Sequence, residues 1–415
     1  MKHENIQQGR RTFLKSVAAA MAVPLFVKGS VLGRDGQVSP NSQLTAMSIG
    51  LGNRGNEILH GFAMNPQSRI LGICDCYTVH AERAVNRVNE WYQNKDCKQF
   101  ARYEDVLQRD DIDYVVIATP DHWHTKITIE ACKAGKDVFC EKPLTYTLAE
   151  GRQIVAAARK YNRVCSSGSQ RVMEDYGYMA PVIQSGAIGE VKEVFIGVGG
   201  PPKPCNLPEQ PVPEGMDWDR WLGQAPWAPY NSERCSGSYG GGWRQYEEYC
   251  NGFLADWGAH KFGGTLYALK LDTTDPVEII PAGFRDNKNM MAVFANGIKI
   301  HHDQSHDITF IGTEGEYRHG NRELKPLKTV EVRRYHGNAT HIIDDFLYCV
   351  KNRLRPFQDV EYGANTATFC QLMHIGYKLN RPLKWNQAET CFVDDEQANR
   401  LVSHAARSPY TFSVD

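Results

Sequence analysis

The sequence predicts an α/β protein of two domains: a parallel sheet interleaved with helices, followed by an α+β domain with an antiparallel sheet. Strand and helix patterns alternate over residues 44–165, which indicates parallel strands joined by helical crossovers. The alternation then stops, and short β-rich runs follow within residues 166–415. A chain of 415 residues also exceeds what one ordinary core accommodates, so two domains are expected.

The strands of the first domain are short apolar runs, and the segments between them have helical character. The expected elements are a strand at 46–49, a glycine-rich turn at 50–55, a helix at 56–63, a strand at 69–74, a helix at 80–91, a strand at 114–118, a helix at 126–134 and a strand at 137–140. Parallel strands end at one edge of their sheet, and open α/β sheets bind ligands there.

The turn after the first strand has the spacing G-x-G-x-x-G and opens a helix. In a dinucleotide-binding unit Gly50 permits the tight turn, Gly52 lets the backbone approach a pyrophosphate, and Gly55 allows close helix packing. Asp75 ends the second strand, twenty positions after Gly55, where a carboxylate accepts hydrogen bonds from ribose hydroxyls. No Arg or Lys directly follows Asp75, so the sequence favours NAD over NADP. The alternative is that Asp75 is only a turn residue.

A second signal follows the strand at 137–140, where Glu141, Lys142 and Pro143 come directly after Cys140. Packing would favour an apolar residue at the position of Lys142, and the strand brings this lysine to the ligand-binding edge of the sheet. A lysine held there can be partly desolvated and exchange protons near neutral pH. A solvated loop lysine is the alternative.

The segment Ala118–His124 ends one strand and starts the next helix. Pro120 stops the strand, because proline has no N–H to donate to a sheet. His122 and His124 are expected to serve helix initiation and packing rather than direct catalysis.

The second domain is predicted from β-rich runs and two closing helices. The runs lie at 191–198, 277–280, 291–294, 298–301 and 308–311, and the helices at 341–350 and 363–377. Gly297 after Asn296 predicts a type I′ hairpin turn. Because antiparallel sheets often form dimer faces, we expect a homo-oligomer that assembles through this sheet.

Tryptophans crowd a segment of the second domain that is rich in Gly and Tyr. They are Trp218, Trp221, Trp227 and Trp243. Aromatic rings stack on the apolar faces of sugars, but large aromatics also fill cores. Both interpretations remain open, with Trp243 the candidate sugar contact.

Asp256 and His260 are four residues apart, so in a helix they would share one face. A carboxylate one turn from an imidazole can orient it and raise its basicity, as a proton-transfer site needs. A surface Asp–His pair is the alternative, but Lys142 makes a proton relay the preferred interpretation.

Composition excludes several classes of protein. Apolar residues make up 42% and charged residues 23%, as in soluble globular proteins, and the net charge is −1. This balance gives no electrostatic case for nucleic acid or an anionic membrane surface. The twelve cysteines are scattered and include no CxxC pair, so we interpret most of them as small buried hydrophobes and propose no metal site.

The N-terminal segment predicts export. Arg10 and Arg11 precede a short, weakly apolar stretch at 16–26, which looks like a twin-arginine signal over residues 1–33 and predicts a periplasmic protein. The stretch is too short to span a bilayer, so no membrane anchor is expected. Residues 34–43 are polar and are expected to form a linker.

These motifs, taken in order, resemble the Gfo/Idh/MocA family, the group of glucose–fructose oxidoreductase and inositol dehydrogenase. The resemblance rests on the turn at 50–55, the segment at 118–124, Cys140–Pro143 and Asp256–His260, and it covers roughly residues 44–410. It implies a Rossmann domain, then an α+β domain with an open, mostly antiparallel sheet.

The resemblance also implies roles for single residues. Lys142 would be the proton-relay lysine, and Asp256 and His260 would bind substrate hydroxyls, with His260 the base. Gln170 would lie near the substrate together with Trp243. The implied cofactor contacts are Gly50, Gly52, Asn53, Arg54, Gly55, Asp75, Thr119, Pro120, His124, Glu141 and Lys142.

Three functions are consistent with this pattern. The first is an NAD-dependent oxidoreductase acting on a hydroxyl of a sugar, sugar derivative or cyclitol, with tightly bound cofactor. The second is a glycosidase or lyase that uses bound NAD for transient ring oxidation followed by elimination. The third is a catalytically silent sugar-binding protein, against which the intact Lys142, Asp256 and His260 argue.

Overall fold

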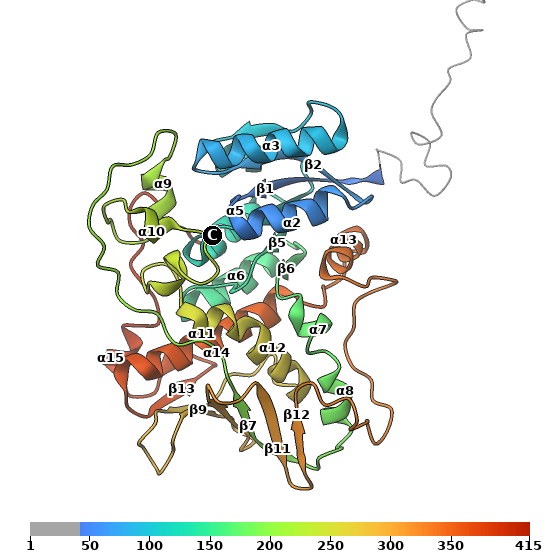
Figure 1. Ribbon diagram of the computed structural model, residues 1–415, viewed down its shortest axis with the longest axis vertical. Helices are drawn as coiled ribbons and strands as arrows, with labels where there is room; N and C mark the ends of the chain where they lie inside the picture. Colours follow the sequence, from blue (N-terminus) through green and yellow to red (C-terminus); the bar gives the residue numbers. More distant parts are fainter. Residues whose placement is uncertain (1–41) are drawn as a thin grey trace, which may run out of the picture. The chain divides into compact units, whose positions relative to one another are not determined.

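A computed structural model describes residues 42–415 of the chain (Figure 1). The predicted export signal at 1–33 and most of the linker at 34–43 lie outside the described residues. Within residues 44–415, the chain forms one compact unit. This unit contains both predicted sheets.

The first sheet has six strands, all parallel, in the order β3-β2-β1-β4-β5-β6. The elements are β1 (Leu44–Ile49), α2 (Asn53–Ala63), β2 (Ser68–Cys74), α3 (Thr78–Tyr92), β3 (Lys98–Phe100), α4 (Tyr103–Leu107), β4 (Tyr114–Ile117), α5 (Asp121–Lys133), β5 (Asp137–Cys140), α6 (Leu148–Lys160) and β6 (Cys165–Ser167). The strand order reverses direction between β1 and β4, and doubly wound sheets bind ligands in the crevice at that point. The predicted Rossmann domain is confirmed.

Two strands of this sheet carry no sequence signal. Lys98–Phe100 is short, polar and largely exposed, and Cys165–Ser167 is polar although it is buried. Neither has the apolar periodicity by which a strand is predicted. Both form because the edge of a neighbouring strand offers hydrogen bonds: β3 pairs with β2, and β6 pairs with β5.

The second sheet has eight strands in the order β12-β11-β7-β10-β9-β8-β13-β14. Only β7 and β10 pair in parallel, so the prediction of a mostly antiparallel sheet is confirmed. Its strands are β7 (Val191–Ile196), β8 (Glu278–Ile280), β9 (Met290–Val293), β10 (Lys299–His302), β11 (Ile308–Gly312), β12 (Glu316–Arg318), β13 (Leu383–Asn386) and β14 (Cys391–Phe392).

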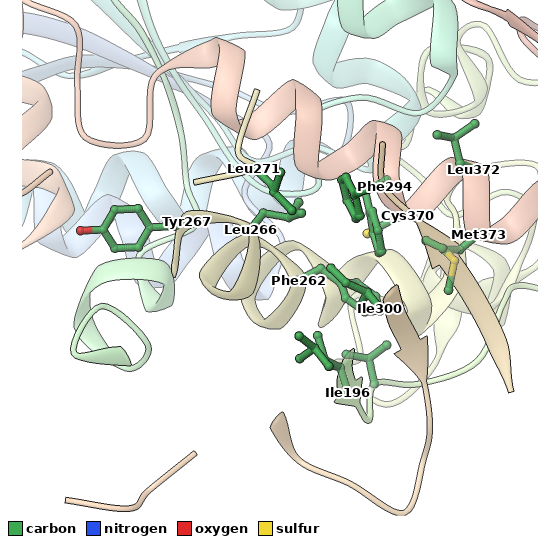
Figure 2. Close-up of a cluster of buried hydrophobic side chains, with 14 of the residues drawn as sticks. Ile196, Phe262, Leu266, Tyr267, Leu271, Phe294, Ile300, Cys370, Leu372 and Met373 are labelled. Atoms are coloured by element: carbon green, nitrogen blue, oxygen red, sulfur yellow. The ribbon is translucent and has the colours of Figure 1, made fainter. Parts of the chain in front are cut away.

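Helices of the second half pack on one face of this sheet and around the first. They are α7 (Arg171–Glu174), α8 (Met179–Gln184), α9 (Trp218–Leu222), α10 (Ser232–Cys235), the 3₁₀ turn Gly242–Gln245, α11 (Gly252–Asp256), α12 (Gly258–Leu269), α13 (Ile342–Asn352), α14 (Val360–Leu379) and α15 (Glu396–Asn399). Figure 2 shows the core between α12, α14 and the sheet, where Phe262, Ile300 and Met373 meet. Burial of apolar side chains from both helices fixes them to the sheet.

Helix α13 belongs to the C-terminal part of the chain but covers the first sheet (Figure 1). Its Phe346 ring lies 5.4 Å from that of Tyr114 and 5.6 Å from that of Phe139. The C-terminal part of the chain therefore completes the core of the first domain.

The hairpin at Asn296-Gly297 differs from the type I′ turn that the sequence predicted. A type I′ turn needs positive φ at both central residues, and Gly297 has a φ of 87° but Asn296 has no positive φ. The Gly297 amide donates to the Phe294 carbonyl, and the Phe294 amide donates to the Ile298 carbonyl. This pattern is a three-residue loop with a left-handed glycine at its end.

The twelve cysteines are all free thiols, and most are buried, as predicted. Within residues 42–415, no helix combines the length and hydropathy that crossing a bilayer requires.

Candidate functional site

A cavity of about 700 Å³ lies at the carboxyl edge of the first sheet, in the size range of small-molecule sites. It gathers most of the residues predicted from the sequence, although they are far apart in the chain. Those lining it are Gly50, Gly52, Asn53, Arg54, Asp75, Thr119, Pro120, Glu141, Lys142, Gln170, Trp243, Asp256 and His260. Gly55 lies behind the turn, and His124 lies outside the lining.

The three glycines of the turn meet different surroundings. Gly50 has a φ of 84°, and a Cβ there would lie 2.8 Å from the backbone of Ala118. A Cβ on Gly55 would lie 2.0 Å from the carbonyl oxygen of Gly50, so only glycine lets α2 pack against the turn. Gly52 faces open space, with no protein atom within 4 Å of a Cβ. The turn thus leaves a path along the backbone to the start of α2.

Asp75 lies at the end of β2, and its carboxylate accepts two backbone hydrogen bonds. The Leu51 amide donates to Oδ2 at 2.6 Å and the Tyr77 amide to Oδ1 at 2.8 Å. The carboxylate therefore orders the glycine turn and also borders the cavity. Arg83, eight residues further on α3, lines the cavity as well, although no Arg or Lys directly follows Asp75 in the sequence.

Arg54 connects three segments of the site. Its Nε donates to Glu141 Oε1 at 2.8 Å, its Nη2 donates to Gln170 Oε1 at 3.3 Å, and its Nη1 donates to Glu57. Glu141 is buried, so this ion pair holds the start of α2 against the loop after β5. Asn53 makes a further link, since its Nδ2 donates to the Gly237 carbonyl at 3.1 Å.

Lys142 is bonded to Asp256, which comes from the second half of the chain. Its Nζ lies 2.5 Å from Asp256 Oδ1 and donates to the Asp256 carbonyl at 3.1 Å. The side chains are 14% and 13% exposed. Arg244 Nε lies 3.7 Å from the same carboxylate oxygen. One aspartate therefore holds two cationic groups at the cavity wall.

His260 is not paired with Asp256, contrary to the expectation from their spacing. Helix α11 ends at Asp256 and α12 begins at Gly258, and the carboxylate turns to Lys142. His260 Nδ1 is buried without a hydrogen-bond partner among the described residues. Burial, with the positive charge of Lys142 next, holds the pKa of His260 well below its usual range. The site keeps this imidazole neutral instead of raising its basicity.

His124 was expected to contact the cofactor, and in the structure it lies outside the cavity lining, between two backbone carbonyls. Its Nδ1 lies 2.7 Å from the Pro143 carbonyl oxygen and its Nε2 lies 2.9 Å from that of Thr119. The ring joins the loops after β4 and β5 beneath the cavity, and burial lowers its pKa. His122 is also buried and lies against Trp221, in agreement with the predicted packing role.

The tryptophans divide between core and surface. Trp218, Trp221 and Trp243 belong to a buried aromatic cluster, and Trp243 presents only 8% of its surface. Trp257 is 40% exposed and lines the cavity beside His260. Trp257 was not predicted as a site residue, and its position inside the Asp256–His260 motif is the signal that indicates it.

Asp121 and Arg244 also line the cavity and were not predicted. Asp121 begins α5 and is fully buried, and its Oδ1 has no hydrogen-bond partner among residues 42–415. Burial, with the charge of Asp256 next, raises the pKa of Asp121 to about 8. This carboxyl therefore holds a proton at neutral pH.

A group of potential metal ligands lies elsewhere, around the start of α13. His336, Asp345 and Cys349 approach one another closely. His336 Nδ1 lies 2.8 Å from Asp345 Oδ1, and the Phe357 amide donates to the other oxygen. The carboxylate is thus satisfied by hydrogen bonds, and we assign no metal to it.

Comparison with known families matches both halves of the chain. The model of the oxidoreductase family's NAD-binding Rossmann fold matches residues 45–169, and the model of its C-terminal alpha/beta domain matches residues 202–412. The chain belongs to the Gfo/Idh/MocA oxidoreductase family. The resemblance inferred from the motifs is confirmed, and the first sheet is this family's NAD-binding domain.

Curated relatives match over shorter stretches. The chain is 40% identical over 120 residues to glycosyl hydrolase family 109 protein 2 of Shewanella sp. (strain ANA-3), covering 28% of this chain and 26% of that protein. It is 28% identical over 206 residues to a glycosyl hydrolase family 109 protein of Shewanella baltica (strain OS185), covering 44% of each. The chain thus spans less than half of the length of these relatives.

Solved structures share the fold at low identity. The WlbA dehydrogenase from Chromobacterium violaceum, in complex with NADH and UDP-GlcNAcA, has a TM-score of 0.58 and 16% identity over 83% of this chain and 97% of that one. The myo-inositol 2-dehydrogenase from Lactobacillus plantarum has a TM-score of 0.55 and 17% identity over 82% and 99%.

Proposed function

We propose that this protein oxidises or reduces a hydroxyl of a sugar, sugar derivative or cyclitol with NAD. The observation that carries the proposal is the convergence of Lys142, Asp256 and His260 in the cavity that the glycine turn borders. Family membership supports redox chemistry, and the proximity of the three side chains supports proton transfer at the same place.

The residues present fit a dinucleotide. Gly52 is the N-cap of α2, makes no side-chain cap, and faces open space, so the first N–H groups of the helix are available to a pyrophosphate. No acidic residue lies in the first turn of α2. Asp75 borders the same cavity, where ribose hydroxyls would reach its carboxylate. NAD, when bound, supplies the hydride acceptor.

The side chains at the other end of the cavity would handle the substrate hydroxyl. His260 is neutral and its Nδ1 has no competing partner among the described residues, so the ring can accept the hydroxyl proton. Lys142 is held in place by Asp256 and can stabilise negative charge on the reacting oxygen. Trp257 offers a half-exposed ring on which a sugar face can stack.

The direct test is spectroscopic. Purified protein is incubated with a panel of monosaccharides and cyclitols, and NADH formation is followed by absorbance while products are identified by mass spectrometry. A ketone product from at least one member supports the proposal. Full NAD loading with no oxidised product from any member would favour the silent binding protein.

We further propose that NAD stays bound through many turnovers and that each catalytic cycle restores its redox state, because a second substrate, or the same sugar after elimination, takes the hydride back. The predicted twin-arginine signal motivates this, because export of a folded protein would carry the cofactor to a compartment with little free NAD. The protein should retain NAD through dialysis, measured as nucleotide released on denaturation. Empty protein that needs millimolar NAD would contradict the closed cycle.

A second candidate function is a redox-neutral glycosidase that oxidises a ring carbon, eliminates the aglycone and reduces the product again. The similarity to glycosyl hydrolase family 109 proteins favours it. So does Asp121, since a cavity-lining carboxyl that keeps its proton at neutral pH can protonate a leaving alcohol. Release of the aglycone from aryl glycosides without net NADH formation would support this candidate over the dehydrogenase.

A further inference from the structure

The cavity wall carries an arginine, Arg244, that shares its carboxylate partner Asp256 with Lys142. Arg244 lies in the 3₁₀ turn Gly242–Gln245 and is 9% exposed. Its Nη1 donates to the carbonyl oxygens of Gly237 and Ser238 at 3.5 and 3.3 Å. Its Nε is buried and has no hydrogen-bond partner among the described residues. The guanidinium of this cavity-lining residue therefore has an N–H group, at Nε, that donates no hydrogen bond within residues 42–415.

The neighbouring carboxyl groups do not give Arg244 a partner of its own. The nearest carboxylate oxygen, Asp256 Oδ1, lies 3.7 Å from Arg244 Nε and is already bonded to Lys142 Nζ at 2.5 Å. Asp121, the other carboxyl of this wall, holds its proton at neutral pH because burial raises its pKa to about 8. His260 is neutral. Two cations therefore share one anion.

The other cavity arginines that are at least partly shielded from solvent differ in this respect, whereas Arg83 also lines the cavity but is exposed to solvent. Arg54 bonds Glu141, Arg171 bonds Asp175, and Arg220 bonds Glu104, each at hydrogen-bond distance. Burying a cation without a bonded anion is costly unless a ligand completes it. The shared carboxylate of Arg244 is thus a feature of the end of the cavity where Lys142 and Asp256 lie.

The aromatic residues around Arg244 fix its orientation. Its guanidinium carbon lies 4.2 Å from the centre of the Trp243 ring and 5.3 Å from that of Tyr239. Stacking holds the planar group in place. A guanidinium fixed in this way is suited to planar or tetrahedral oxyanions, which it binds through paired N–H groups.

We infer that the substrate is an acidic sugar, whose carboxylate or sulfate group binds Arg244 while its reacting hydroxyl faces Lys142 and His260. The inference rests on the proposed function, in which the substrate is a sugar, and it specifies further that this sugar carries a negative charge. Because Arg244 and Lys142 share Asp256, an anionic substituent and a ring hydroxyl of one small molecule can engage both. Trp243 acts through Arg244 as a positioning residue rather than as a stacking surface.

The test measures binding, so it does not depend on turnover. NAD-loaded protein is titrated calorimetrically with matched pairs: galacturonate against galactose, glucuronate against glucose, and galactose 6-sulfate against galactose. The acidic member of at least one pair should bind about ten- to a hundredfold more tightly, as expected for a charge-assisted hydrogen bond. The pairs separate carboxylate from sulfate.

Two variants and a control locate the effect. Arg244→Gln should abolish the preference and leave NAD retention unchanged, and Arg244→Lys should restore part of it. Arg220→Gln, in which the arginine lost already has a carboxylate partner, should keep the preference. Equal or tighter binding of every neutral sugar, or no binding of any acidic one, would overturn the inference. So would a preference that survives in Arg244→Gln, or a loss of NAD instead of sugar in that variant.

The outcome is separable from that of the proposed function. If an acidic sugar binds through Arg244 and no oxidised or cleaved product forms, the charge assignment stands and the activity fails. If a neutral sugar is oxidised and no acidic sugar is preferred, the activity stands and the charge assignment fails.

Discussion

Replacing Lys142 by alanine removes the only side chain within residues 42–415 that bonds the Asp256 carboxylate at short distance. Two hydrogen bonds are lost, to Asp256 Oδ1 at 2.5 Å and to the Asp256 carbonyl at 3.1 Å. Asp256 is 13% exposed, so its charge would then depend on Arg244 at 3.7 Å. Removing one partner of a buried ion pair costs about 3–5 kcal/mol, which is below most of the range of roughly 5–15 kcal/mol that stabilises a typical protein.

We therefore expect Lys142→Ala to fold and to keep NAD, while turnover falls by about 10²–10⁴-fold, the contribution of a positioned acid–base group. The assay is steady-state turnover on the sugar that the wild-type protein converts, with NAD content measured after denaturation of the dialysed protein. Lys126→Ala is a matched control, because Lys126 is a buried lysine bonded to Glu130 on α5 away from the cavity. Unchanged turnover in Lys142→Ala, or an equal loss in Lys126→Ala, would refute the reasoning.

The other predictions concern the cofactor and the base. Gly52→Ala should fold normally, because no protein atom lies within 4 Å of the added Cβ, yet bind NAD weakly; normal NAD affinity would move the pyrophosphate elsewhere. Gly55→Ala should lower the melting temperature as well, since its Cβ would meet the Gly50 carbonyl at 2.0 Å; an unchanged thermal denaturation curve would contradict this. Asp75→Ala should weaken NAD binding and reduce discrimination against NADP, measured by calorimetry with both nucleotides, and identical NAD affinity would rule out the ribose contact. Because the pKa of His260 is lowered, the ring stays neutral in mild acid, so kcat/KM should remain level as pH falls through 6.5; an acid limb at or above that pH would exclude His260 as the base.

The sequence by itself predicted the features that depend on neighbouring residues. The glycine turn, the strands before it and after it, and the lysine after β5 all follow from local periodicity and from glycine positions whose backbone geometry the structure shows. A buried parallel strand can be predicted from its sequence when its own residues are apolar and turn residues flank it. This was enough for strands β1, β2, β4 and β5, for the helices that follow the first three of them, and for the family.

The tertiary structure decided which side chains meet. The four-residue spacing of Asp256 and His260 predicted a pair on one helix face, but the approach of Lys142 gave the carboxylate a cationic partner from another element. An ammonium group binds a carboxylate more strongly than a buried neutral imidazole does. That competition depends on the packing of two segments 114 residues apart, which no local pattern encodes.

The sequence also did not predict residues whose protonation state or ion pairing depends on neighbours in the folded structure. Asp121 is protonated because burial removes the water that would stabilise its charge, and Arg244 has only a shared carboxylate because Lys142 is already bonded to Asp256. Likewise β3 and β6 lack strand periodicity and exist because a neighbouring strand offers hydrogen bonds. The sequence determined the elements and the residue types at the sheet edge. Only the tertiary structure decided their partners, burial and charge, because these are set by groups distant in the chain that packing brings together.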